Sequence, residues 1–208
     1  MSDLVGVGNV VGINDGLSLI AYDQFTDTDG TNLSAHTSDT GHSWLAVAGQ
    51  INIVGNQAKV VTAPAHYVMD LSAEAKQPAE LLLQIKDTDA TEQRAEKTIR
   101  DESDGLNYIE LDVYANSTAA VLTINEVKAG VSVGKATKFI LGDYRDELNF
   151  FGVIVRDLGD SIILDASIIE PNLVAKWSGA PSPTGKGIGL FVSDSRTTNV
   201  FDYPVVSG

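Results

Sequence analysis

The densest group of potential metal ligands is the acidic turn Asp27-x-Asp29-Gly30, with Asp23 and Asp39 close to it in the sequence. Calcium takes about six to eight oxygen ligands, and two carboxylates around a glycine bend suit it. The complete calcium-loop pattern, which ends on a bidentate Glu, is absent. The same residues also suit a tight turn whose aspartates accept backbone hydrogen bonds while Gly30 takes a positive φ. We favour the turn and keep Asp27 and Asp29 as candidate calcium ligands.

Other reactive groups are sparse. His36, His42 and His66 are the only histidines, and the chain has no cysteine. His36 and His42 could bind a metal beside Asp39, but no third ligand stands at a characteristic spacing. Neither a Gly-x-Ser-x-Gly motif nor a phosphate-binding P-loop occurs. We therefore predict no catalytic residue and no cofactor apart from possible calcium.

The two tryptophans differ in context. Trp44 precedes an alternating run, which is typical of a core residue. Trp177 lies in the Pro/Gly-rich stretch Lys176–Pro181, which favours an exposed loop. An exposed aromatic ring can stack on the apolar face of a sugar, so Trp177 is a candidate ligand-binding residue.

Short β-type runs separated by Gly, Asn, Asp, Ser and Pro indicate an all-β sandwich or barrel. The clearest run is Tyr108–Tyr114, where Ile109, Leu111 and Val113 share one face while Glu110 and Asp112 share the other. Further strands are expected at residues 50–54, 58–62, 80–85, 120–127, 150–155, 161–169 and 187–192. The stretch Ala90–Arg100 is rich in helix formers and predicts an exposed loop or one short helix.

The first twenty residues differ from the rest. They combine frequent glycines with aliphatic residues that suit burial against a partner: Val5, Val7, Val10, Val11 and Ile13. Two interpretations stay open, an arm that orders against a neighbouring subunit and an extra edge strand of the same domain. We divide the chain into this segment, residues 1–20, and one domain, residues 21–208.

The charge is strongly negative, with 28 acidic and 14 basic residues and a net charge of −14. The first basic residue is Lys59. Nucleic acids and anionic lipids are bound through Lys and Arg clusters, so we predict neither a nucleic-acid nor a membrane partner. The excess acid suits solubility, or alternatively a cation or a basic partner. Residues 1–16 lack the basic region of a secretory signal, which predicts synthesis in a cytoplasm.

The stretch Asp23–Trp44 closely resembles the opening of a concanavalin A-like (lectin-like) domain found in virion structural proteins of tailed phages. The matching positions are Asp23, Phe25, Thr28-Asp29-Gly30-Thr31, Leu33, His36-Thr37-Ser38-Asp39, Gly41 and Trp44. Near the other end, Gly187–Phe191 and Phe201–Val206 are similar to the closing strands of such domains. Pro204 departs from the family pattern and predicts that the last strand lies at a sheet edge.

This resemblance implies a concanavalin A-like jelly-roll β-sandwich of two antiparallel sheets, whose first and last strands pair. Glycoside hydrolases of this fold carry a Glu-x-Asp-x-Glu strand, and here Tyr114 replaces the third carboxylate after Glu110 and Asp112. We therefore expect Glu110 and Asp112 to form a solvated strand face, and the protein not to be an enzyme.

The resemblance implies a non-enzymatic virion structural protein, a capsid decoration (cement) protein or a tail-associated accessory. Its partners would be the major capsid or tail protein and further copies of itself, and it would reside in the virion after synthesis in the host bacterial cytoplasm. The alternative is a carbohydrate-binding, lectin-like module that attaches to a host or other glycan.

Overall fold

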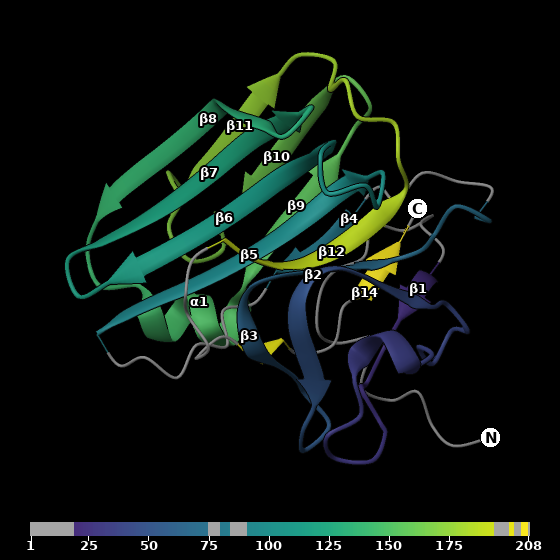
Figure 1. Ribbon diagram of the computed structural model, residues 1–208. Coiled ribbons are helices and arrows are strands. Elements are labelled where there is room, and N and C mark those ends of the chain that lie inside the picture. Colours follow the sequence, from purple (N-terminus) through teal and green to yellow (C-terminus); the bar gives the residue numbers. More distant parts are fainter. Residues whose placement is uncertain (1–18, 75–79, 84–90, 194–199, 202–204, 208) are drawn as a thin grey trace.

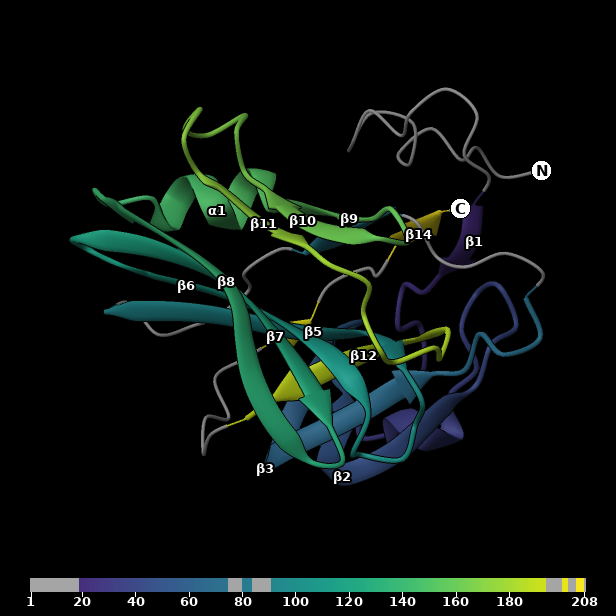
Figure 2. The same ribbon diagram turned by 90° about the horizontal axis from the view of Figure 1, so that it is seen from above.

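The computed structural model describes residues 19–74, 80–83, 91–193, 200–201 and 205–207. More than half of these residues lie in strands, which form two antiparallel sheets that face each other (Figures 1 and 2). The smaller sheet has six strands in the order β1 (Leu19–Tyr22), β14 (Val205–Ser207), β4 (Glu80–Leu83), β9 (Val153–Asp157), β10 (Ser161–Asp165) and β11 (Val174–Ser178).

The larger sheet has eight strands. Their order is β13 (Val200–Phe201), β3 (Ala58–Met69), β12 (Gly187–Val192), β5 (Glu92–Asp101), β6 (Tyr108–Asn116), β7 (Ala119–Lys128) and β8 (Val131–Leu141), and β2 (Trp44–Ile53) also pairs with β3. These two facing sheets confirm the predicted all-β sandwich of two antiparallel sheets. No helix among the described residues is long and apolar enough to cross a membrane.

Alternation along the strands builds the core between the sheets. In β6, Ile109, Leu111 and Val113 have no exposed surface and belong to the core cluster, as their spacing predicts. The alternate residues of the same strand, Glu110 and Asp112, therefore lie on the outer face of the larger sheet, away from the other sheet.

The two ends of the domain pair with each other, as the resemblance implies. Leu19 lies opposite Ser207, and Tyr22 lies opposite Val205. The prediction that the last strand is an edge strand is wrong, because β14 lies between β1 and β4. Pro204 itself lies outside the described residues.

Two local predictions are corrected. Residues 92–101 form the ten-residue strand β5 instead of a loop or helix. Between its neighbours β12 and β6, the stretch exchanges backbone hydrogen bonds on both edges, which outweighs the weak helix propensity of its residues. The predicted strand at 150–155 begins only at Val153, since residues 145–151 form the short helix α1 (Arg145–Phe151).

Candidate functional site

The residues that carry the phage-domain resemblance meet in one buried network. The carboxylate of Asp23 accepts hydrogen bonds from the Phe25 backbone N–H at 2.7 Å and from Trp44 Nε1 at 2.6 Å. His36 Nε2 lies 2.9 Å from the same carboxylate. Asp23 and Phe25 have no exposed surface, and Trp44 is buried as predicted. The network ties the end of β1 to the start of β2, so these residues build a corner of the fold.

Asp27 and Asp29, the candidate calcium ligands, stabilise the turn that forms part of this corner. Asp27 accepts a hydrogen bond from the Thr28 N–H at 2.7 Å and lies 3.2 Å from His36 Nδ1. Asp29 accepts from the Gly55 N–H at 2.8 Å, and Gly30 has a φ of +92°. Within the described residues, no three His, Asp or Glu side chains are grouped so as to hold a metal ion.

The three histidines lie in separate places. His36 belongs to the corner, and His42 Nε2 lies 3.5 Å from Glu74. His66 is buried on the outer face of the larger sheet, 2.7 Å from Asp101, whose carboxylate also accepts from the Thr98 hydroxyl. The rings of Tyr108 and Phe191 pack against His66 with centroids 5.2 Å away.

The outer face of the larger sheet gathers charged side chains that are far apart in the sequence. The register places Glu96 of β5 opposite Asp112 of β6, and Arg94 opposite Tyr114. Arg94 donates two hydrogen bonds to Asp112, at 2.8 and 3.0 Å, and lies 3.1 Å from Glu96. Glu96 also accepts from the backbone N–H and the hydroxyl of Ser193.

This arrangement corrects the expectation of a solvated strand face. Glu110 is only 9% exposed and Glu96 is not exposed at all. Burial raises the pKa of Glu96 to about 7, against the hydrogen bonds from Ser193 and the charge of Arg94. Burial, together with the charge of Asp112, also raises the pKa of Glu110.

More accessible polar groups continue the face toward β8. Thr123 of β7 lies opposite Asp112, and Thr137 of β8 lies opposite Thr123. Asn125, opposite Glu110, hydrogen-bonds to it. Next to this row, Tyr114 is half-buried and donates its hydroxyl to Glu92 at 2.8 Å. The outer face thus offers fixed carboxylates, a guanidinium, an amide and hydroxyls side by side.

Trp177 lies in strand β11 and not in the loop that the sequence predicts. The residue is half-buried and packs against the core cluster. Lys135 Nζ of β8 lies 5.3 Å from the centroid of its ring, and this lysine is also paired with Glu126 at 2.8 Å. The other candidate binding residues, Val5, Val7, Val10, Val11 and Ile13, lie outside the described residues.

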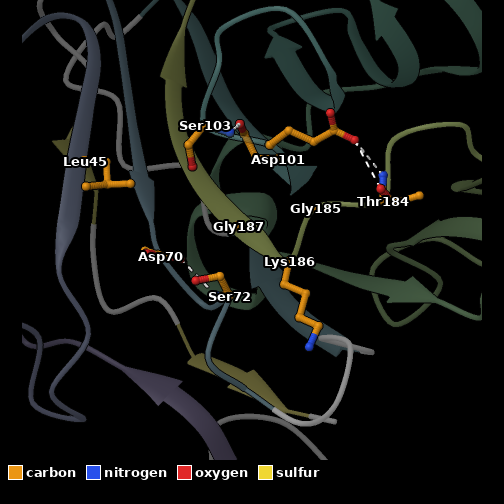
Figure 3. Close-up of a pocket in the computed structure, with 10 residues that line it drawn as sticks. Leu45, Asp70, Ser72, Asp101, Ser103, Thr184, Gly185, Lys186 and Gly187 are labelled. Carbon is orange, nitrogen blue, oxygen red and sulfur yellow. Dashed lines mark hydrogen bonds between the residues drawn. The ribbon is translucent and has the colours of Figure 1, made fainter.

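A polar pocket of about 390 Å³ lies where the ends of β3 and β5 meet the starts of β2 and β12 (Figure 3). Its carboxylates are engaged within the protein: Asp70 accepts from the Ser72 N–H, Asp101 from the Ser103 N–H, and Glu102 from Thr184. These hydrogen bonds hold the loops around the pocket in place. The polar residues that line the pocket therefore stabilise the connections between the strand ends.

Glu96 and Arg94 are the functional candidates that sequence reasoning missed. The signal was present as alternation: Ala95, Lys97 and Ile99 face inward, whereas Arg94, Glu96 and Thr98 face outward. The alternation with a period of two is not evident from the sequence of this strand. The reason is that Lys97 occupies an inward-facing position, which ordinarily holds an apolar residue.

Comparison with solved structures found matches that include two bacterial proteins. The carbohydrate-binding module CBM66 from Bacillus subtilis is 13% identical over 79% of this chain and 91% of its own, with a TM-score of 0.47. A β-glucanase from Bacillus licheniformis is 12% identical over 89% of this chain and 96% of its own, with a TM-score of 0.42. No family model and no curated protein matches the chain.

Proposed function

We propose that the protein is a non-enzymatic carbohydrate-binding module that holds a glycan on the outer face of its larger sheet. The observation that carries this proposal is the polar row Arg94, Asp112, Thr123 and Thr137, with Tyr114 beside it. Sugar hydroxyls both donate and accept, so they suit a surface on which carboxylate, guanidinium and hydroxyl groups alternate. The Arg94–Asp112 pair fixes two of these groups in advance, which lowers the entropy lost on binding.

The proposal excludes glycoside hydrolysis, because that reaction requires two carboxyl groups flanking the scissile bond. Besides Glu110 and Asp112, this face holds the carboxylate of Glu96 opposite Asp112, but Glu96 is completely buried and its oxygens are occupied by Ser193 and Arg94. At the third position of the Glu-x-Asp-x-Glu pattern stands Tyr114, whose hydroxyl is bonded to Glu92. We expect no release of reducing ends from polysaccharides; cleavage that disappears in Glu110→Gln would contradict this.

A glycan array probed with the purified full chain tests binding. We expect the double variant Asp112→Asn/Thr123→Ala to lose at least about tenfold in affinity for any glycan bound, a loss of about 1.4 kcal/mol. The control Lys176→Ala changes an exposed residue of the smaller sheet and should bind as the unaltered protein does. Absence of binding to every glycan, or equal binding by the double variant, would overturn the proposal.

The second candidate is a structural protein of a tailed-phage virion, either a capsid decoration protein or a tail-associated accessory. It rests on the sequence resemblance of residues 23–44, whose Asp23, His36 and Trp44 build the buried corner. Its partners would be the capsid or tail protein and other copies, without nucleic acid or membrane. Mass spectrometry and cryo-EM of purified particles test this candidate, and absence of the chain from the particle would contradict it.

A further inference from the structure

Strand β8 leaves one long edge of the larger sheet open. It pairs with β7 from Val131 to Leu141, and no strand of the described part of the chain pairs with its other edge. Eleven residues are long for an edge strand, and their free backbone N–H and C=O groups can accept a further strand.

The side chains of this edge are unusually apolar for an exposed strand. Val131, Val133, Phe139 and Leu141 are 63%, 50%, 57% and 72% exposed. Residues 128–141 also hold three lysines and no acidic residue, in a chain whose net charge is −14. A complementary occupant is therefore an extended apolar segment that is free of Lys and Arg and flanked by acidic residues.

One segment of this chain has that chemistry. Residues 5–13 lie between Asp3 and Asp15, and no basic residue occurs before Lys59. The aliphatic residues of this segment are Val5, Val7, Val10, Val11 and Ile13. Nine residues in extended form span about 30 Å, which fits within the roughly 36 Å of an eleven-residue strand.

The segment cannot reach β8 of its own copy. Ile13 precedes Leu19, the first residue of β1, by six residues, which span at most about 22 Å. β1 and β11 are opposite edges of the six-stranded sheet, about 24 Å apart at strand spacings of roughly 4.8 Å. β8 lies beside β11 in the facing sheet, offset by about 10 Å perpendicular to the first sheet, so it is about 26 Å from β1 (Figures 1 and 2).

We propose that residues 5–13 of a second copy add a strand to the open edge of β8, so that the protein assembles with itself by exchanging these segments. Backbone hydrogen bonds fit a glycine-rich segment to the edge, and its valines cover the exposed apolar side chains of β8. This proposal does not rest on glycan binding: although Thr137 of the polar row belongs to β8, self-association and glycan binding are measured by separate experiments.

Sedimentation velocity of the full chain and two variants tests the proposal. We expect the full chain to form dimers or larger assemblies, and both Δ2–18 and Val133→Asp/Leu141→Asp to be monomeric. The matched control Leu158→Asp/Ile168→Asp adds the same charge at residues that are 57% and 71% exposed and lie outside β8, and it should assemble as the full chain does. Circular dichroism melting verifies that each variant is folded.

Mixing the two variants tests which part of the chain donates the added strand and which part accepts it. The Δ2–18 chain keeps the acceptor edge and the β8 variant keeps the donor segment, so an equimolar mixture should form a one-to-one complex although each alone is monomeric. A monomeric full chain, assembly that survives either change, or a mixture that stays monomeric would overturn the proposal. Assembly lost only in the β8 variant would indicate pairing of two β8 edges instead.

Discussion

Two buried ionisable groups respond to pH through different causes. Burial works to lower the pKa of His36, but hydrogen bonds and charge interactions with Asp23 and Asp27 outweigh it and raise the pKa. Burial raises the pKa of Glu96 to about 7. Each group binds its proton more tightly in the folded state, so each contributes stability at low pH that is lost as pH rises through its folded pKa.

Replacing Glu96 isolates its contribution. Between about pH 4.5 and 7 the folded protein retains the Glu96 proton and the unfolded chain releases it, so the free energy of unfolding falls by on the order of 3 kcal/mol across this window. In Glu96→Gln this decrease should be absent, so the variant gains in melting temperature relative to the unaltered protein as pH rises from 5 to 8. The exposed Glu147→Gln serves as control. Parallel pH profiles for Glu96→Gln and the unaltered protein would disprove the assignment.

The Asp23 carboxylate is the acceptor on which the corner depends. Its removal in Asp23→Ala leaves the Phe25 N–H, the Trp44 indole N–H and the His36 ring without their buried partner. We expect the free energy of unfolding to fall by about 3–5 kcal/mol in urea denaturation. Asp146→Ala, on the exposed side of α1, should change it by less than about 0.5 kcal/mol. Equal effects of the two substitutions would contradict the role of Asp23.

At the scale of elements, Asp27 and Asp29 stabilise the turn between β1 and β2 through the hydrogen bonds of their carboxylates. Asp27 bonds to the next residue and to His36, whereas Asp29 reaches across to Gly55, in the turn between β2 and β3. Carboxylate oxygens that already serve as turn acceptors are available to a cation only if these bonds are exchanged.

Calcium is therefore expected to leave the turn unchanged. We predict equal melting temperatures in millimolar calcium and in EDTA, whereas Asp29→Ala should lower the free energy of unfolding by about 1 kcal/mol through loss of the Gly55 bond. Differential scanning calorimetry measures both. A rise in melting temperature with calcium that vanishes in Asp27→Asn/Asp29→Asn would instead identify a calcium site, by the stabilisation that binding to the folded state confers.

At the scale of the whole molecule, the sandwich closes where the two ends of its described part meet. β1 begins at Leu19, two residues before the expected domain boundary, and its pairing with β14 joins the two ends of the domain. Both sheets and the core cluster are formed by described residues.

Deletion of residues 2–18 should consequently preserve the fold. We expect the Δ2–18 chain, compared as monomers at low concentration, to melt within about 3 °C of the full chain and with the same β-rich circular dichroism spectrum. A cooperative transition that disappears on deletion would show that these residues belong to the domain.

The sequence alone determined the features that depend on local alternation and on the ends of the chain. The spacing of Ile109, Leu111 and Val113 fixes their common face, because successive side chains of a strand point to opposite sides. The resemblance around Asp23 and Trp44 led to the jelly roll and to pairing of its two ends.

Only the tertiary structure decided which strands became neighbours and therefore which polar residues were buried. Glu96 faces Asp112 because β5 pairs with β6 in one particular register, which the alternation within either strand does not encode. Glu110 loses its solvent for the same reason, since neighbouring strands surround it on both sides. Burial and pairing are properties of the assembled sheet, so the pKa of Glu96 and the position of β14 inside its sheet arise only once long-range hydrogen bonds have selected one arrangement of strands.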